Sequence, residues 1–77
     1  MTKVKVFQKG NLIAVFNTID SPHFEVGEAI MLKDTKEDII HGYQILNIVH
    51  QFLVDSTQKT SQYSIQLTVV ECKTIVN

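Results

Sequence analysis

Residues 43–54 read YQILNIVHQFLV, and residues 63–72 read YSIQLTVVEC. From Tyr63 to Val69, apolar and polar side chains alternate, which is the period-two pattern of a β-strand that buries one face. The segment between the two stretches, residues 55–62, is polar and contains no glycine. We interpret the two stretches as the arms of one long β-hairpin, around which the rest of the chain is organised.

The first of these stretches allows two interpretations. Its apolar residues also recur at spacings of one, three and four, as they do along one face of a helix. We favour the strand, because β-branched and aromatic residues dominate the stretch and no helix cap stands near Gly42. A regular strand places Tyr43, Ile45, Val49 and Leu53 on one face, and Leu46, Ile48, Phe52 and Val54 on the other. Both faces of this strand would then be apolar.

The composition is that of a globular protein. The chain has 77 residues, of which 44% are hydrophobic and 19% are charged. This length predicts a single domain over residues 1–77, and no apolar run approaches the roughly 20 residues of a transmembrane helix. Residues 1–9 carry neither an apolar run nor a cleavage site, so we expect a soluble, cytoplasmic protein without a membrane partner.

The charged residues argue against a dedicated nucleic-acid binder. The net charge is −1, and all seven basic residues are lysine. Arginine supplies most bidentate contacts to phosphate and guanine, so its absence makes a nucleic-acid partner an unfavoured prediction. The lone cysteine, Cys72, cannot form an internal disulfide, and we expect it to be a small packing or rim residue rather than a nucleophile.

Three further strands are predicted from the amino-terminal half of the chain. Residues 3–9 and 12–19 form the first two, and Gly10-Asn11 between them is a two-residue hairpin turn. Residues 24–33 alternate as a third strand that bends at Gly27. Residues 34–38 have the spacing of a single capped helical turn, for which a plain polar turn is an equal alternative.

The first strand carries a lysine stripe. Val4 and Val6 point to one face, and the other face carries Lys3, Lys5, Phe7 and Lys9. Lysines with an interleaved aromatic residue could hold single-stranded nucleic acid. The alternative that we favour is a solvated face, or an edge strand that its lysines protect from pairing with other chains.

We find no sequence motif for catalysis, for a metal or for a cofactor. The three histidines, His23, His41 and His50, have no close ligand spacing to one another. His50 stands in an apolar stretch, so we expect it to be partly buried or part of an interface. We therefore predict a protein that is not an enzyme and holds neither metal nor cofactor.

Three runs of sequence resemble the layout of small β-barrel modules: FEVGEAIML at 24–32, GYQILNI at 42–48 and YSIQL at 63–67. The layout is similar to that of SH3-like barrels, among them the head-closure and neck proteins of tailed bacteriophages, which assemble into rings. It is also similar to PUA-like and ASCH-type RNA-binding barrels, although this chain lacks their basic residues and is shorter. The resemblance implies a small barrel, and for the first family a phage origin, but it transfers no functional residue.

The combined expectation is an all-β fold. It is either a small SH3-like barrel or a strongly bent antiparallel sheet of about five strands, with one short helical turn as an option. Large aliphatic residues on both faces of two strands exceed what one small sheet can cover with itself. We therefore expect a non-enzymatic assembly or protein-interaction module that self-associates. Its candidate interface residues are Ile13, Val15, Leu46, Ile48 and Phe52. The alternative function is a single-stranded nucleic-acid binder that uses the lysine stripe.

Overall fold

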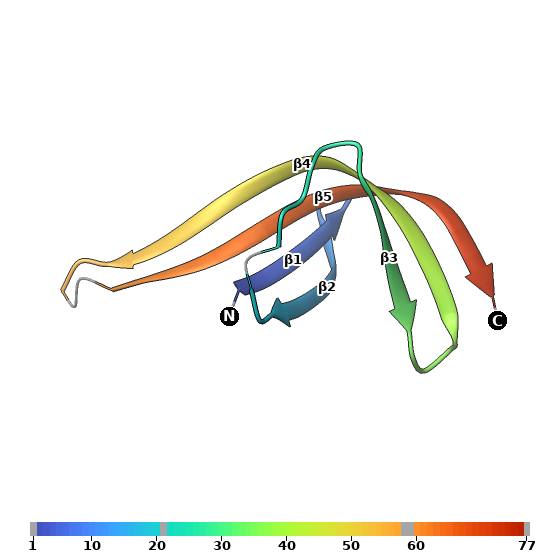
Figure 1. Ribbon diagram of the computed structural model, residues 1–77, viewed down its shortest axis with the longest axis horizontal. Helices are drawn as coiled ribbons and strands as arrows, with labels where there is room; N and C mark the ends of the chain where they lie inside the picture. The colour runs from blue at the N-terminus through green and yellow to red at the C-terminus, as the bar shows by residue number, and fades with distance from the viewer. Residues whose placement is uncertain (1, 21, 58–59, 77) are drawn as a thin grey trace.

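The computed structural model describes residues 2–20, 22–57 and 60–76, and these form one five-stranded sheet without a helix (Figure 1). The strand order in the sheet is β2-β1-β5-β4-β3. The strands are β1 (Thr2–Gln8), β2 (Asn11–Thr18), β3 (Ala29–Asp34), β4 (Ile39–Asp55) and β5 (Thr60–Val76). The predicted all-β class is confirmed, and residues 43–54 are a strand and not a helix.

The β4–β5 hairpin is the longest element and the centre of the sheet. Its two strands have 17 residues each and pair antiparallel along their whole length. β3 pairs with β4 only as far as Gln44, and β1 pairs with β5 only from Ser64 to Thr68. The hairpin therefore extends well beyond the strands beside it, as Figure 1 shows.

The pairing of β1 with β5 is parallel, which corrects the prediction of an antiparallel sheet. A tight hairpin forces antiparallel pairing, but β1 and β5 are separated by most of the chain and so are free of that constraint. β1 also pairs with β2 on its other side, so it is an interior strand. The interpretation of its lysines as guards of a sheet edge is therefore wrong.

The sheet is not closed into a barrel. Its two edges are β2 and β3, and no backbone pairing joins them in the part of the chain that the structure describes. The sheet nevertheless bends so strongly that both edges curl toward the same side of the β4–β5 hairpin (Figure 1). Of the two predicted architectures, the strongly bent sheet is the one observed.

Three β-bulges interrupt the pairing. The register shifts beside Ile13 in β2, Leu46 in β4 and Cys72 in β5, and each of these residues is left without a cross-strand partner in the ladder. A bulge adds one residue to one strand, bends that strand and reverses the alternation of side chains beyond it. These bulges contribute to the bend, and they decide which apolar residues share a face.

The bulge at Leu46 overturns the predicted faces of residues 43–54. Beyond it, Ile48 returns to the face of Ile45, because it pairs with the buried Leu67. We call the face that carries the core the inner face, and the opposite face the outer face. The inner-face residues of β4 are Tyr43, Ile45, Ile48, His50, Phe52 and Val54. Those on the outer face after the bulge are Asn47, Val49, Gln51, Leu53 and Asp55.

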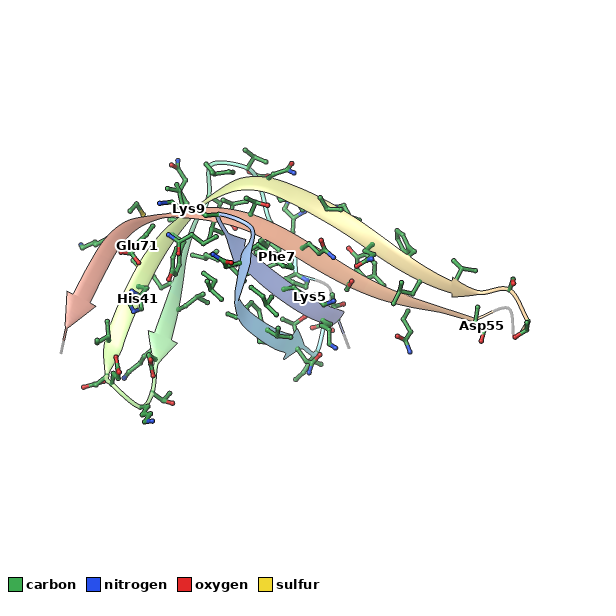
Figure 2. All side chains as sticks on the ribbon, turned by 180° about the vertical axis from the view of Figure 1, so that it is seen from behind. Lys5, Phe7, Lys9, His41, Asp55 and Glu71 are labelled. Atoms are coloured by element: carbon green, nitrogen blue, oxygen red, sulfur yellow. The ribbon has the colours of Figure 1, made fainter. Side chains whose placement is uncertain are left out.

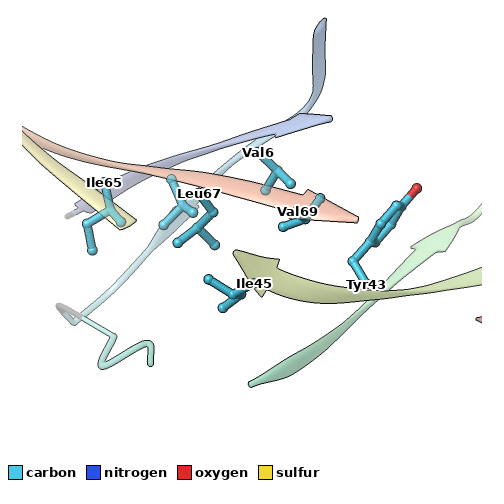
Figure 3. Packing of buried hydrophobic residues seen from close by; sticks show 7 residues of the cluster. Val6, Tyr43, Ile45, Ile65, Leu67 and Val69 are labelled. Atoms are coloured by element: carbon cyan, nitrogen blue, oxygen red, sulfur yellow. The ribbon is translucent and has the colours of Figure 1, made fainter. Parts of the chain in front are cut away.

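The core lies on the inner face, under the bend (Figure 3). Residues of β1, β4 and β5 form it, and partly buried side chains from β2, β3 and the segment before β3 pack against it. The buried apolar residues are Val4, Val6, Tyr43, Ile45, Ile65, Leu67 and Val69. The prediction that Val4 and Val6 point away from the lysine stripe is confirmed.

Turn geometry shifts two predicted boundaries. The β1–β2 turn consists of Lys9 and Gly10, whose φ angles are 51° and 80°, and Asn11 already pairs with Gln8. The predicted Gly10-Asn11 turn is therefore one residue too late, and Lys9 is a turn residue rather than part of the strand. The third strand begins at Ala29, because Gly27 adopts a φ of 92° in a turn before it.

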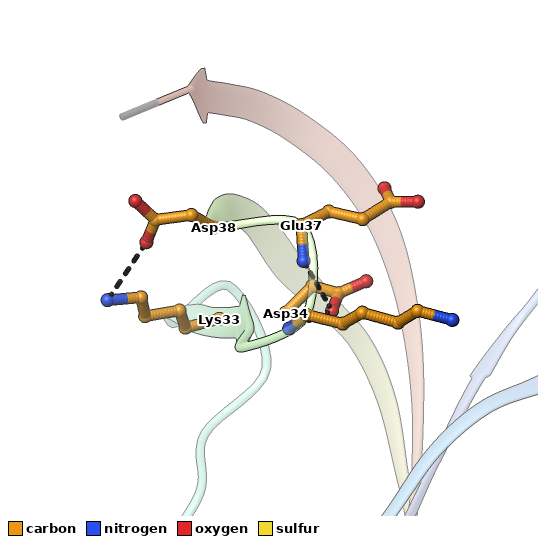
Figure 4. Close-up of polar contacts among 5 residues, drawn as sticks. Lys33, Asp34, Glu37 and Asp38 are labelled. Carbon is orange, nitrogen blue, oxygen red and sulfur yellow. Dashed lines mark hydrogen bonds and ion pairs between the residues drawn. The ribbon is translucent and has the colours of Figure 1, made fainter.

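A polar turn joins β3 to β4, so the optional helical turn is absent (Figure 4). The Asp34 carboxylate accepts hydrogen bonds from the backbone N–H groups of Lys36, at 2.9 Å, and Glu37, at 3.3 Å. Lys33 and Asp38 form an ion pair of 3.2 Å across the base of the turn.

The other predicted loop, residues 55–62, is shorter than expected, because β4 includes residue 55 and β5 begins at residue 60. Residues 58–59 lie outside the described part of the chain.

Substitution in the core tests this fold. Leu67 is fully buried and Leu12 is exposed on the edge strand, so Leu67→Ala removes core contacts that Leu12→Ala does not. We expect Leu67→Ala to lower the free energy of unfolding by about 2–5 kcal/mol and Leu12→Ala to lower it by less than about 1 kcal/mol. Urea unfolding followed by circular dichroism measures both. Equal losses for the two variants would contradict the placement of the core.

Candidate functional site

The free end of the β4–β5 hairpin projects away from the rest of the sheet (Figure 1). We call residues 46–55 of β4 together with residues 60–63 of β5 the arm. Within the described residues, no third strand pairs with either side of it. The arm is thus a two-stranded ribbon, in which Ile48 and Tyr63 still pack against the core.

Apolar side chains of the arm are exposed on both of its faces. Phe52 and Val54, on the inner face, keep 63% and 70% of their surface accessible to solvent. Val49 and Leu53, on the outer face, keep about half of theirs, as does Leu46 at the bulge. Several large apolar side chains exposed on one element are typical of an interaction surface.

An aromatic cluster orders the inner face of the arm. The Tyr63 ring stacks on Phe52, with centroids 4.9 Å apart, and on His50, with centroids 5.9 Å apart. The Tyr63 hydroxyl and the His50 Nδ1 share a hydrogen bond of 2.6 Å. His50 is exposed, so it is not partly buried, and its predicted place in an interface stays a prediction. These contacts position the three rings relative to one another.

The outer face of the arm is more polar. The Gln51 Oε1 accepts hydrogen bonds from the Gln66 Nε2, at 2.7 Å, and from the Ser64 hydroxyl, at 3.4 Å. These hydrogen bonds connect β4 to β5 at the end of the arm that joins the sheet. Val49 and Leu53 flank Gln51 on the same face, so a polar centre lies between two apolar residues.

The structure separates the five residues predicted for the interface. Leu46 and Phe52 are exposed on β4, whereas Ile48 is half-buried against the core. Ile13 and Val15 are exposed on β2, with β1 and β5 between them and β4. The five residues therefore do not form one patch.

The predicted interface also left out four residues of the arm, namely Val49, Leu53, Val54 and Tyr63. The length of the predicted hairpin, which exceeds that of the other predicted strands, is the signal in the sequence that could have found them.

The lysine stripe of the alternative function lies on the outer face. Lys3, Lys5 and Phe7 share this face, whereas Lys9 lies in the turn. A hollow of about 520 Å³ opens beside the first two, where the arm diverges from β1 and β2. Its lining residues are Lys3, Lys5, Asn17, Leu53, Gln62, Tyr63 and Ser64. The hollow thus combines two cations with amide and hydroxyl groups, and Figure 2 shows the position of Lys5 on β1.

A second hollow, of about 330 Å³, lies between the two edges of the open sheet, with β2 on one side and β3 and β4 on the other. His41 and Tyr43 line it, and their rings stack with centroids 6.2 Å apart. The buried His41 Nδ1 lies 3.4 Å from the Glu71 Oε2, at a geometry that makes no hydrogen bond (Figure 2). Burial, and secondly the Glu71 carboxylate, raise the pKa of the Tyr43 hydroxyl above its ordinary value.

Metal and membrane features receive no support from the described part of the chain. In residues 2–20, 22–57 and 60–76, no three His, Cys, Asp or Glu side chains are grouped as metal ligands would be. No helix within these ranges could cross a membrane. The Cys72 thiol is exposed at its bulge, so the expectation of a rim residue is met and that of a packing residue is not.

Comparison of the chain with protein-family models, with curated proteins and with solved structures finds no match. The resemblance to SH3-like and PUA-like modules stays a prediction.

The raised pKa of Tyr43 predicts a dependence of stability on pH. A raised pKa in the folded state favours the neutral phenol, so its contribution to stability is complete below about pH 10 and is lost as the pH rises beyond that value. We expect Tyr43→Phe, which cannot ionise, to lose less stability than the wild type between neutral pH and about pH 11. Urea unfolding at both pH values measures the difference. Parallel losses in the two proteins would contradict it.

Proposed function

We propose that this chain is a non-enzymatic protein-interaction module that self-associates through the arm. The observation that supports this most directly is the exposure of Phe52, Leu53 and Val54 on a ribbon that projects beyond the sheet. Within the described residues no third strand pairs with that ribbon, so these three side chains keep more than half of their surface in water.

The energetic cost of leaving this surface in water supports the proposal. Fully burying one large apolar side chain is worth roughly 1.5–3 kcal/mol. The stability of an entire small domain is only about 5–15 kcal/mol, so several exposed side chains of this size are a substantial fraction of it. A partner that covers the arm would recover part of that free energy, and the stacked rings of Phe52 and Tyr63 would lose little conformational entropy on binding.

The state of association in solution tests the proposal. We expect light scattering at micromolar concentration to give a mass above the 8.8 kDa of the monomer. The double variant Phe52→Ser and Leu53→Ser should shift the protein to the monomer. Ile19→Ser is the control, because Ile19 is 87% exposed but lies outside the arm, directly after β2.

Two results would oppose the proposal. One is a wild-type protein that stays at 8.8 kDa throughout the micromolar range. The other is a loss of association in Ile19→Ser that equals the loss in the double variant, since the association would then not depend on the arm.

The hollow beside Lys3 and Lys5 favours a second candidate function, the binding of single-stranded nucleic acid. The outer face here carries two cations and the aromatic Phe7, and the hollow adds the side-chain amides of Asn17 and Gln62. Cations and aromatic residues on one face are the elements of such sites. The overall charge of −1 and the absence of arginine weigh against it, so we place it second.

Oligonucleotide binding tests this second function. Affinity for single-stranded RNA or DNA should fall as salt concentration rises, and the double variant Lys3→Gln and Lys5→Gln should lose binding at low salt. The control with the same change in charge is Lys36→Gln with Lys73→Gln, because both of these lysines lie outside the hollow. Absence of wild-type binding at low salt would exclude the function.

A further inference from the structure

The arm presents an open backbone edge along β4. Ile45 is the last residue of β4 whose backbone is bonded on that side: its N–H donates to the Glu28 carbonyl, at 2.9 Å, and its carbonyl accepts from the Gly27 N–H, at 2.8 Å. Beyond it, no strand of the described chain pairs with β4 on the side away from β5. An edge of this length can accept another strand.

The side chains show which backbone groups point to this open edge. In a β-strand, residues that share a face also direct their N–H and C=O groups to the same edge. Ile45 is on the inner face, and its backbone groups point away from β5. The inner-face residues beyond the bulge therefore point their backbone groups outward in the same way. These residues are Ile48, His50, Phe52 and Val54.

The edge is self-complementary about Gln51. Residues 47–55 read NIVHQFLVD, with Gln51 at the centre. Residues at equal distances before and after Gln51 are similar, as Val49 is to Leu53 and Ile48 is to Val54. We propose that two copies of this chain join their β4 edges antiparallel about a two-fold axis at Gln51, forming one continuous sheet. This inference rests on the proposed function and names both the partner and the mode of association.

The proposed register satisfies the backbone and the side chains together. It places Ile48 opposite Val54 and His50 opposite Phe52, and all four have outward-pointing backbone groups, which gives about eight hydrogen bonds between the copies. It also brings Val49 of each copy against the partner's Leu53 on the outer face, which covers two side chains that are now half exposed. If the register were shifted by one residue, backbone groups that point away from β5 in one copy would face groups that point toward β5 in the other. The hydrogen bonds between the copies could then not form.

Charge distribution agrees with pairing between identical strands. Residues 46–54 contain no lysine or acid, and in the proposed register the terminal Asp55 meets Asn47 rather than another acid. The segment also lacks proline and glycine, so the usual protection of an edge strand is missing. The two outermost strands of the sheet are less suitable, because a bulge at Ile13 interrupts β2, and β3 has six residues and includes Lys33.

Disulfide trapping tests the register. In a Cys72→Ser background, which removes the exposed native thiol, Gln51→Cys would place two thiols across the two-fold axis. Gln51 is a non-hydrogen-bonded position, where opposite Cα atoms lie about 4.5 Å apart, within the range that a disulfide spans. We expect Gln51→Cys to cross-link at least about tenfold faster than Leu53→Cys, whose copies would lie about 14 Å apart.

A mixture provides a test that does not disturb Gln51, whose side chain bonds to Gln66. Val49→Cys and Leu53→Cys proteins, each in the Cys72→Ser background, should form a mixed disulfide on oxidation while neither cross-links efficiently alone. Far-UV circular dichroism of each variant confirms that the fold is retained.

The possible outcomes separate this inference from the proposed function. If the wild type associates but Gln51→Cys and the mixture both fail to cross-link, the association exists and the proposed edge pairing is wrong. If Leu53→Cys cross-links as fast as Gln51→Cys, the register is wrong. A wild type that is monomeric in light scattering overturns both proposals.

Discussion

Antiparallel pairing between β4 and β5 is the interaction on which the rest of the structure depends. Sixteen residues of each strand take part. β3 joins the sheet through β4, β1 joins it through β5, and β2 is attached through β1. Because the pairing continues beyond the reach of β1 and β3, the same hairpin forms the centre of the core at one end and an uncovered ribbon at the other. The core and the candidate interaction surface are therefore two parts of one element.

The bulge at Leu46 determines how that element is used. It returns Ile48 to the inner face, where the core needs a large aliphatic residue, and it continues the inner face outward through His50 and Phe52. The cost is an exposed leucine at the bulge and two exposed aliphatic residues on the outer face. No further strand in the described residues covers them, and the proposed self-association rests on this exposure.

Two polar arrangements keep the arm ordered without burying it. On the inner face, Tyr63 stacks on two rings and shares a hydrogen bond with His50. On the outer face, Gln51 accepts bonds from two residues of β5. Ordered side chains lose less entropy when they bind, so these contacts suit a surface that meets a partner more than one that stays in water. The two faces also differ in chemistry, and the open edge between them is the feature that a second strand would recognise.

The amino-acid sequence by itself determined the all-β class, the long hairpin and the burial of Val4 and Val6, because period-two alternation is a local property of each strand. It also identified Leu46 and Phe52 as surplus apolar residues. Only the tertiary structure decided the bulges, the parallel pairing of β1 with β5 and the open edge of β4, since each depends on which distant strand lies alongside. A single inserted residue reverses a face without changing local composition, so Ile48 was assigned to the wrong side. For the same reason Ile13 and Val15, similar in sequence to the residues of the arm, proved to lie two strands away from it.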